Sequence, residues 1–445
     1  MIRTLGFKLG TIALLILLLL IPLSLIDGLV GERQRLRDAV LQDIARSSSY
    51  PQQINGPLLV LPYRKSVREW RTGADGQRYQ EEKEHAGRLY FLPERFALTG
   101  DVSTETRSRG IYQARLYHGQ SHISGRFALP ERFGLGEAFA DYRFEPAFLA
   151  VGISDIRGIR NDLVVTLNGQ AFGFQPGSGD VRLGAGVHAP LPSLTSAAQP
   201  LDFAFDLDLQ GSERLAINPV GRDSRIELKS DWPHPSFFGE YLPSERETDA
   251  KGFTARWQTS FFATNLQEAL ANCVRNPSCA SFPVRELGVT FIDPVDQYLK
   301  SERAIKYALL FVLLTFAGFF LFEVLKRLAV HPVQYSLVGL SLALFYLLLV
   351  SLSEHLGFGL AYGLSAGACV GLNAFYVGNV LRSGVRGLGF GAMLAALYGM
   401  LYGLLSAEDY ALLMGSLLVF GVLAAVMLLT RRLDWYGLTG KPVAP

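Results

Sequence analysis

Long apolar runs lie in two parts of the chain, one near its start and the others after residue 304. The first reads LGTIALLILLLLIPLSLI, residues 9–26, and follows Arg3 and Lys8. A hydrocarbon layer about 30 Å thick needs roughly 20 apolar residues per helix, which these runs supply. The pattern predicts six membrane-spanning helices, at residues 9–26, 305–323, 333–352, 359–380, 388–405 and 411–430.

The first apolar run is expected to stay in the protein as an anchor. A secretory signal peptide is the alternative, but DGLVGERQR, which follows the run, offers no small-x-small cleavage site. Six spans place both termini on one side of the membrane. The loops on that side carry basic residues, namely Lys326, Arg327, Arg382, Arg386, Arg431, Arg432 and Lys441. The opposite short loops carry Glu354, His355, Glu408 and Asp409.

This charge asymmetry predicts the orientation. Short loops rich in Lys and Arg stay in the cytoplasm, so both termini are expected there. Residues 27–304 are then extracytoplasmic, which in a Gram-negative cell means periplasmic. Basic residues flank this long segment as well, but long loops cross the membrane largely regardless of their charge.

Within the long segment the hydropathy pattern changes to period two. GRLYFLPERFALTGDVSTE and PLDFAFDLDLQGSERLAI alternate, and turn signals such as Asn168-Gly169 lie between such stretches. Many short alternating stretches predict antiparallel strands in one or two sandwich-like units. The pentapeptide LPERF occurs at 92–96 and again at 129–133, a weak indication of a duplicated unit.

The predicted architecture is a membrane protein with a large all-β, sandwich-like periplasmic domain between the first and second of six spans. Its parts are expected to be an N-terminus with the first helix, the periplasmic domain with helical stalks, five further helices, and a cytoplasmic tail. Their boundaries are 1–30, 31–304, 305–430 and 431–445.

Two helical stalks are expected where this domain meets the membrane. Leu36, Val40 and Ile44 recur at helical spacing after the first span, and PVDQYLKSERAIKYALL is expected to continue into the second span in the same way. Together the stalks place six basic residues at the membrane surface, namely Arg33, Arg35, Arg37, Lys300, Arg303 and Lys306. These side chains either form ion pairs with nearby acids or bind anionic lipid headgroups.

The chain has three cysteines. Cys273 and Cys279 lie in the segment expected to be oxidising, so a disulfide between them is plausible, and two separate thiols are the alternative. Cys369 lies inside the fourth span, where a small packing residue is expected.

Catalytic motifs are weak throughout. GLSAG at 363–367 matches a nucleophile motif, but it lies in an apolar helix and lacks the strand–turn–helix context. An intramembrane hydrolase would also need a His or an acid at the depth of Ser365. We therefore expect no enzyme activity, no cofactor and no metal site. Glycine recurs at every fourth position of this helix, at Gly359, Gly363, Gly367 and Gly371. This spacing predicts close packing against a neighbouring helix.

Two groups of residues remain as candidates for function. Glu354 and His355 lie at the outer end of the third span, as a simple turn or as a functional pair. With Asn373 and Asn379 they could line a transport path, in which His355 would couple to protons. In WPHPSFFGEYLP, residues 232–243, an aromatic-rich loop could recognise a partner through Trp232, His234 and Phe237, and a surface turn capped by core aromatics is the alternative.

Charge excludes one class of partner. The chain has 42 Lys and Arg against 40 Asp and Glu, a net charge of +2, which gives no reason to expect nucleic-acid binding. The expected partners are membrane lipids and proteins of the envelope.

Five stretches together resemble the CreD family of bacterial inner-membrane proteins across nearly the whole chain. They are ERQRLRDAVLQDIA, INGPLLVLPY, SDWPHPSFFGEYLP, ELGVTFIDPVDQYLKSERAIKYALLFVLLTFAGFFLFE and HPVQYSLVGLSLALFYLLLVSLSEHLGF. The resemblance implies an inner-membrane protein that supports cell-envelope integrity, belongs to the CreBC regulon, and contributes to tolerance of envelope-directed toxins and antibiotics. It implies no catalytic residues and no ligand.

Overall fold

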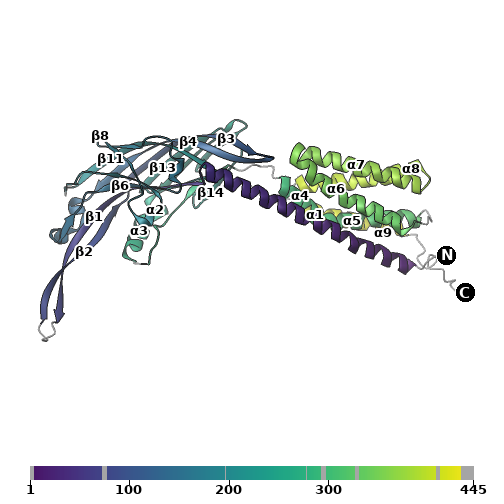
Figure 1. The fold of residues 1–445 in the computed structure, drawn as a ribbon, viewed down its shortest axis with the longest axis horizontal. Coiled ribbons are helices and arrows are strands. Elements are labelled where there is room, and N and C mark those ends of the chain that lie inside the picture. Colours follow the sequence, from purple (N-terminus) through teal and green to yellow (C-terminus); the bar gives the residue numbers. More distant parts are fainter. Residues whose placement is uncertain are drawn as a thin grey trace. The chain divides into compact units, whose positions relative to one another are not determined.

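The computed structural model describes residues 5–72, 78–195, 197–276, 278–291, 297–325, 330–406 and 411–431. The chain divides into two compact units, one made of Met1–Asp38 and Val295–Pro445 and the other of Ala39–Pro294. The first is helical and the second is mostly β (Figure 1). Each unit is described by itself.

The helical unit consists of long apolar helices and one short polar helix. Their bounds are α1 Leu5–Ser47, α4 Gln297–Lys306, α5 Ala308–Leu325, α6 Pro332–Leu356, α7 Phe358–Val380, α8 Gly384–Ser406 and α9 Ala411–Thr430. The end of α1 belongs to the β unit. Every apolar run picked out in the sequence is therefore helical.

Helix length and composition support fewer spans than the six that the hydropathy pattern predicts. Among the described residues, four helices are long and apolar enough to cross a membrane, namely α1, α6, α7 and α8. The pair α4 and α5 is bent by 48° and counts as a fifth only if it forms one broken span, and the apolar part of α9, Leu413–Leu428, is shorter. The helical stalk α4 leads into α5 as expected, but the chain bends between Lys306 and Ala308.

The helical core is built on large side chains. Leu19, Leu23 and Ile26 of α1 pack against a buried cluster that includes Phe316 of α5 and Tyr346 of α6. Burial of these side chains away from lipid and solvent fixes which face of each helix points inward.

The expected glycine seam of α7 is wrong. A Cβ added to Gly363, Gly367 or Gly371 would meet nothing within 4 Å, so this face is open. Helix α7 instead turns inward its opposite face, which carries large aromatic and hydrogen-bonding side chains. Close contact with α8 comes further along, where a Cβ on Gly387 would lie 2.6 Å from Gly378 Cα.

The β unit contains two sheets. Its strands are β1 Gln52–Thr72, β2 Arg78–Phe91, β3 Arg95–Arg109, β4 Tyr112–Leu129, β5 Tyr142–Phe144, β6 Phe148–Ile153, β7 Val164–Leu167, β8 Gln170–Gly173, β9 Gln175–Pro176, β10 Gly186–Pro190, β11 Gln199–Ser212, β12 Arg214–Asn218, β13 Asp223–Ser230, β14 Pro235–Gly239, β15 Glu245–Asp249, β16 Gly252–Ser260 and β17 Leu287–Phe291. Two short helices, α2 Phe261–Thr264 and α3 Leu266–Arg275, follow β16.

One sheet has nine strands in the order β14-β17-β12-β1-β6-β10-β9, with β2 and β5 also paired to β1. The other has eight strands in the order β15-β16-β13-β3-β4-β11-β7-β8. One apolar core contains side chains of both sheets, such as Leu59 of β1 and Phe96 of β3. This agrees with the expected sandwich. The expectation of purely antiparallel strands is wrong, since β1 with β12 and β3 with β13 are parallel.

Of two local sequence signals, the Asn168-Gly169 turn agrees with the structure and the LPERF repeat does not. Asn168 and Gly169, with φ of 46° and 86°, form the turn between β7 and β8, as predicted. The repeated LPERF adopts two different structures. The first copy leads into β3, whereas the second ends β4 and turns with positive φ at Arg132 and Phe133. The repeat therefore does not mark a duplicated structural unit.

Candidate functional site

Glu354 and His355 do not act as a pair in the structure. The Glu354 side chain is 10 % exposed, and the Tyr298 hydroxyl donates to its Oε1 at 3.0 Å. The Nε of Arg33 lies 3.7 Å from the same oxygen. Glu354 therefore joins α1, α4 and α6, while His355 is exposed at the end of α6.

Four of the six basic residues of the stalks, Arg33, Arg37, Lys300 and Lys306, lie near acids or aromatic rings. Lys306 pairs with Glu302 at 2.8 Å, and Gln34 of α1 donates to the same carboxylate at 3.3 Å. The remaining contacts place Arg37 over the Tyr298 ring and beside Asp38, Lys300 over the Phe358 ring, and Arg35 on the Gly31 carbonyl. The Gln34–Glu302 hydrogen bond and the Arg37–Tyr298 contact connect α1 to α4.

A second buried carboxylate was missed from the sequence. Glu323 of α5 is 3 % exposed, pairs with Lys8 of α1, and accepts from the Tyr335 hydroxyl at 2.8 Å. The backbone N–H of Val330 also donates to it, at 2.9 Å. An acidic residue inside the run FAGFFLFEVL was the available signal, because such residues are rare in apolar helices and are usually paired.

The two carboxylate clusters repeat one arrangement. In each, a carboxylate of the bundle accepts a hydrogen bond from a Tyr hydroxyl and faces a basic residue of α1, Lys8 in one and Arg33 in the other. These two basic residues are separated by about 37 Å along the helix, at about 1.5 Å per residue. That separation exceeds the hydrocarbon thickness of about 30 Å.

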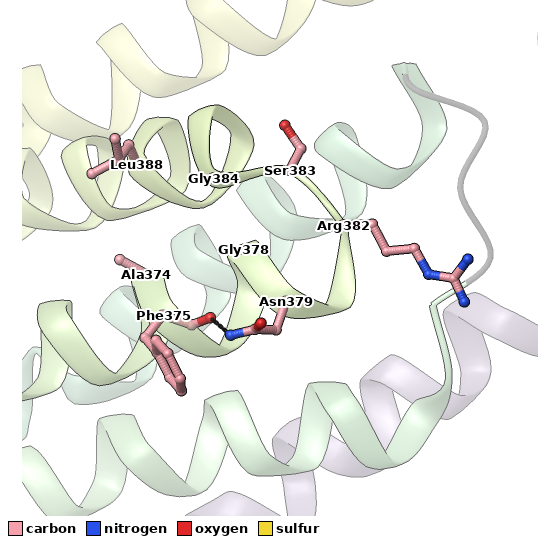
Figure 2. Close-up of a pocket in the computed structure, with 8 residues that line it drawn as sticks. All are labelled: Ala374, Phe375, Gly378, Asn379, Arg382, Ser383, Gly384 and Leu388. Carbon is pink, nitrogen blue, oxygen red and sulfur yellow. Dashed lines mark hydrogen bonds between the residues drawn. The ribbon is translucent and has the colours of Figure 1, made fainter.

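Asn373 belongs to a buried polar ladder between helices. Its Nδ2 donates to Ser341 Oγ of α6 at 2.7 Å and to the Cys369 carbonyl at 2.8 Å, and the Tyr398 hydroxyl of α8 lies 3.1 Å from Cys369 Sγ. Through these contacts Asn373 and Cys369 join α7 to α6 and α8. Asn379 only donates to the Phe375 carbonyl of its own helix (Figure 2).

The candidate nucleophile Ser365 is fully buried, and its hydroxyl has no hydrogen-bond partner within the described residues. His355 is exposed ten residues before it in sequence, at the end of the preceding helix. These two residues do not form the hydrogen-bonded pair that serine nucleophiles use.

In the aromatic segment at 232–243, Trp232 and Phe237 lie in the core, as the alternative of a turn capped by core aromatics has it. Trp232 is 9 % exposed, its indole N–H donates to the His234 carbonyl at 3.0 Å, and the Arg115 guanidinium stacks on it at 4.0 Å. Phe237 lies in β14 and packs on Phe253 and Trp257. Trp232 and Phe237 therefore form part of the core, because large aromatic side chains gain most when they are removed from water.

His234 remains exposed and lines a hollow at the edge of the β unit. Strands β14 and β15 are the terminal strands of the two sheets, and a hollow of about 660 Å³ lies between them. Leu242, which is 68 % exposed, and Arg246 of β15 line it together with His234. No ion pair holds Arg246 within the described part of the chain. Leu242 lies in the segment that the sequence singled out, whereas no sequence signal pointed to Arg246.

A disulfide joins Cys273, in α3, to Cys279, with a Cα–Cα distance of 5.3 Å. Cys273 packs against Phe282 and Leu183 in a small apolar cluster. The cross-link therefore closes a short loop beside that cluster.

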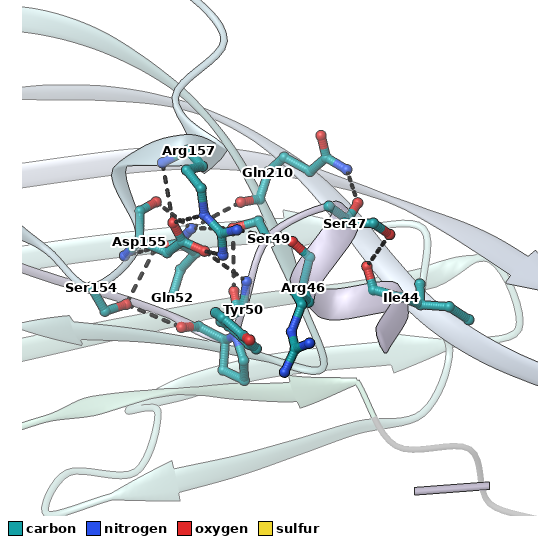
Figure 3. Close-up of polar contacts among 12 residues, drawn as sticks. Ile44, Arg46, Ser47, Ser49, Tyr50, Gln52, Ser154, Asp155, Arg157 and Gln210 are labelled. Carbon is teal, nitrogen blue, oxygen red and sulfur yellow. Dashed lines mark hydrogen bonds and ion pairs between the residues drawn. The ribbon is translucent and has the colours of Figure 1, made fainter. Parts of the chain in front are cut away.

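The end of α1 is fixed within the β unit by a polar cluster (Figure 3). Arg157 donates to both carboxylate oxygens of Asp155, at 2.9 and 2.7 Å, and to the Arg46 carbonyl at 2.9 Å. The Arg157 guanidinium lowers the pKa of Asp155 below its ordinary value. The Gln52 amide donates to the carbonyls of Asp155 and Gln210 at 2.9 and 3.0 Å. This cluster satisfies carbonyls at the end of α1 that a free helix would leave to water.

Comparison with known proteins gives the family. The family described as "Inner membrane protein CreD" matches residues 4–436. The inner membrane protein CreD of Escherichia coli K12 is 38 % identical over 421 residues, which cover 95 % of this chain and 91 % of that protein. A crystal structure of a candidate nutrient-binding protein from Legionella pneumophila covers 49 % of this chain and 82 % of its own, at 10 % identity and a TM-score of 0.24. That score is too low for any argument. The extent of the first two matches makes this chain a member of the CreD family of inner membrane proteins.

Proposed function

We propose that this inner-membrane protein supports the integrity of the cell envelope by binding an envelope protein or lipid through its β unit. In this proposal the six apolar runs all cross the membrane. The positive charges of the short loops then place both termini in the cytoplasm and the β unit in the periplasm. The basic residues around Arg33 and Lys300 would lie at the outer membrane surface, where they could attract anionic headgroups. The envelope role itself is suggested by the family.

One observation supports the binding site, namely the hollow between β14 and β15. It is lined by an exposed apolar side chain, Leu242, and by two polar ones, His234 and Arg246. Concave sites with a mainly apolar lining and few polar groups are where proteins commonly bind ligands. The terminal position of both strands also leaves backbone groups available for an added strand of a partner.

The test uses a strain without the native gene, at matched membrane levels of each variant. Leu242→Asp and the double variant His234→Ala/Arg246→Ala are expected to lose rescue of survival under detergent and envelope antibiotics. Val181→Asp is the matched control, since Val181 is 89 % exposed elsewhere on the β unit. Full rescue by the hollow variants would disprove the site.

Transport of an envelope component is the second candidate function. The observation in its favour is that Ser365 Oγ and Tyr346 OH are buried with no hydrogen-bond partner in the described part of the bundle, near the Asn373 ladder. The four residues first proposed to line a path do not lie together, however, since Glu354 and Asn373 bond different helices. Transport predicts that Asn373→Leu abolishes rescue without lowering the amount of folded protein.

A further inference from the structure

The turn between α7 and α8 encloses a second hollow, in the helical unit. It has a volume of about 560 Å³ (Figure 2). Its walls are the last turns of α7 and the first turn of α8, which Gly387 and Gly378 hold in close contact. A side chain on Gly387 would meet the backbone of α7, so the two helices have a fixed spacing here.

The lining changes from polar to apolar along the helix direction. Arg382 and Ser383 lie in the turn, whereas Phe375 and Leu388 lie further into the helices and are 74 % and 72 % exposed. Figure 2 shows the Arg382 guanidinium beyond the helix ends, away from the two apolar side chains. Seven residues separate Phe375 from Arg382, about 10 Å along a helix. This is the polarity profile of one membrane leaflet, from headgroup to acyl chain.

Arg382 occupies a backbone position that favours another residue. The Ser383 N–H donates to the Gly378 carbonyl at 3.0 Å and the Arg382 N–H to the Asn379 carbonyl at 3.2 Å, which together cap the end of α7. Arg382 itself has a φ of 47°. Glycine is preferred at this position of such a cap, because a side chain is strained there. The chain thus keeps a guanidinium where the backbone alone would favour its removal.

The charge of Arg382 has no carboxylate partner among the residues that the structure describes. A half-buried second cation, Arg386, follows one turn later and also forms no ion pair with any described acid. The site therefore presents positive charge at the helix ends and apolar surface beside it. A ligand that satisfies both parts carries an anionic group and a hydrocarbon chain.

We propose that the α7–α8 turn binds an anionic phospholipid, with its phosphate at Arg382 and its acyl chains over Phe375 and Leu388. Basic sites between transmembrane helices recognise lipid headgroups in this way. The exposed aromatic and aliphatic side chains favour a lipid over a soluble phosphate, which would leave them without a partner. The site is independent of the hollow in the β unit. Its assignment to the cytoplasmic leaflet depends on the proposed orientation.

The test compares lipid retention by the purified full-length protein in neutral detergent. Native mass spectrometry counts bound phosphatidylglycerol and phosphatidylcholine at equal concentrations. The wild-type protein is expected to prefer phosphatidylglycerol, and Arg382→Gly to lose about fivefold of that preference, the contribution of one basic residue at an anionic surface. Because glycine suits the αL backbone, this variant should unfold at the same temperature as the wild-type protein or higher.

Two further variants test the two halves of the site. Arg431→Gln removes the same charge from the end of α9, outside the hollow, and should keep the full preference. Phe375→Ala should weaken retention of phosphatidylglycerol. An unchanged preference in Arg382→Gly, or an equal loss in Arg431→Gln, would overturn the proposal. Stabilisation of the protein by inorganic phosphate alone to the same extent would show that a soluble anion suffices and would overturn it too.

Discussion

At the scale of single residues, neighbours in sequence have different roles. Glu354 is buried against Tyr298 and Arg33, whereas His355 points to the exterior. The sequence placed both at a helix end but could not separate them, because the direction of a side chain depends on how the helix is rotated. That rotation is set by packing partners far away in sequence.

Glu354→Leu is therefore expected to destabilise the helical unit, and His355→Ala to have little effect. The leucine leaves the Tyr298 hydroxyl and the Arg33 guanidinium without their shared acceptor, at a cost of about 1–3 kcal/mol. Thermal unfolding of the purified full-length proteins in one detergent measures the difference. Equal unfolding temperatures for the two variants would contradict the arrangement described for Glu354.

Asp155 makes the stability of the β unit depend on pH. Arg157 lowers the pKa of Asp155 in the folded protein, so the unfolded chain takes up this proton at a higher pH. The stabilisation is complete well above the ordinary pKa of Asp, about 3.9, and is lost as the pH falls through the lowered value.

Asp155→Asn is accordingly expected to cost about 1–3 kcal/mol at pH 7, since a charged hydrogen-bonded pair is lost. The difference from the wild-type protein should shrink as the pH falls from the ordinary pKa of Asp, about 3.9, through the lowered value in the folded protein. Unfolding temperatures measured from pH 7 to about pH 2 test this, with Asp162→Asn as an exposed control. A difference that stays constant over this range would show that the charge of Asp155 is not responsible.

At the scale of elements, the glycines of α7 and α8 separate what the sequence predicts from what it cannot. The six apolar runs predicted the positions of the helices, because long runs of Leu, Phe and Val seldom form any other structure than a helix. Glycine spacing suggested the wrong contact face, because four glycines in register allow close packing but do not require it. The buried face of α7 was decided by Tyr362, Cys369 and Asn373, which bond or pack against neighbouring helices.

Gly387→Ala and Gly367→Ala test this choice of face. The first adds a Cβ 2.6 Å from both the Ala374 carbonyl oxygen and Gly378 Cα, backbone atoms that cannot turn aside. The second adds one where nothing lies within 4 Å. We expect Gly387→Ala to lower the unfolding temperature and Gly367→Ala to leave it unchanged or raise it, since alanine favours a helix over glycine by about 1 kcal/mol. The reverse order would mean that the open glycine face is the packed one.

For the whole molecule, long sequence patterns predicted the secondary-structure elements. They did not predict the contacts between segments that are far apart in the sequence. The alternating stretches predicted a β unit of two sheets, but the parallel pairing of β1 with β12 joins segments that no local signal connects. For the same reason the sequence left open whether Trp232 lies in an exposed loop or caps a turn from the core. It shows an aromatic residue between Asp231 and Pro233, and only the fold brings Arg115 over its ring.

Orientation in the membrane is the remaining property of the whole molecule, and its prediction is the most direct to test. If the β unit is periplasmic and the α7–α8 turn cytoplasmic, single cysteines at Val181 and Ser383 should react from opposite sides of the membrane.

The wild-type protein provides the unlabelled control for this experiment, because Cys273 and Cys279 are bonded and Cys369 is buried. A membrane-impermeant maleimide should label Val181→Cys in cells with a permeable outer membrane and an intact inner membrane. Ser383→Cys should be labelled only after the inner membrane is opened. Labelling of both from the same side would require an even number of crossings between them, whereas the reverse pattern would turn the whole molecule over and place the Arg382 site in the outer leaflet.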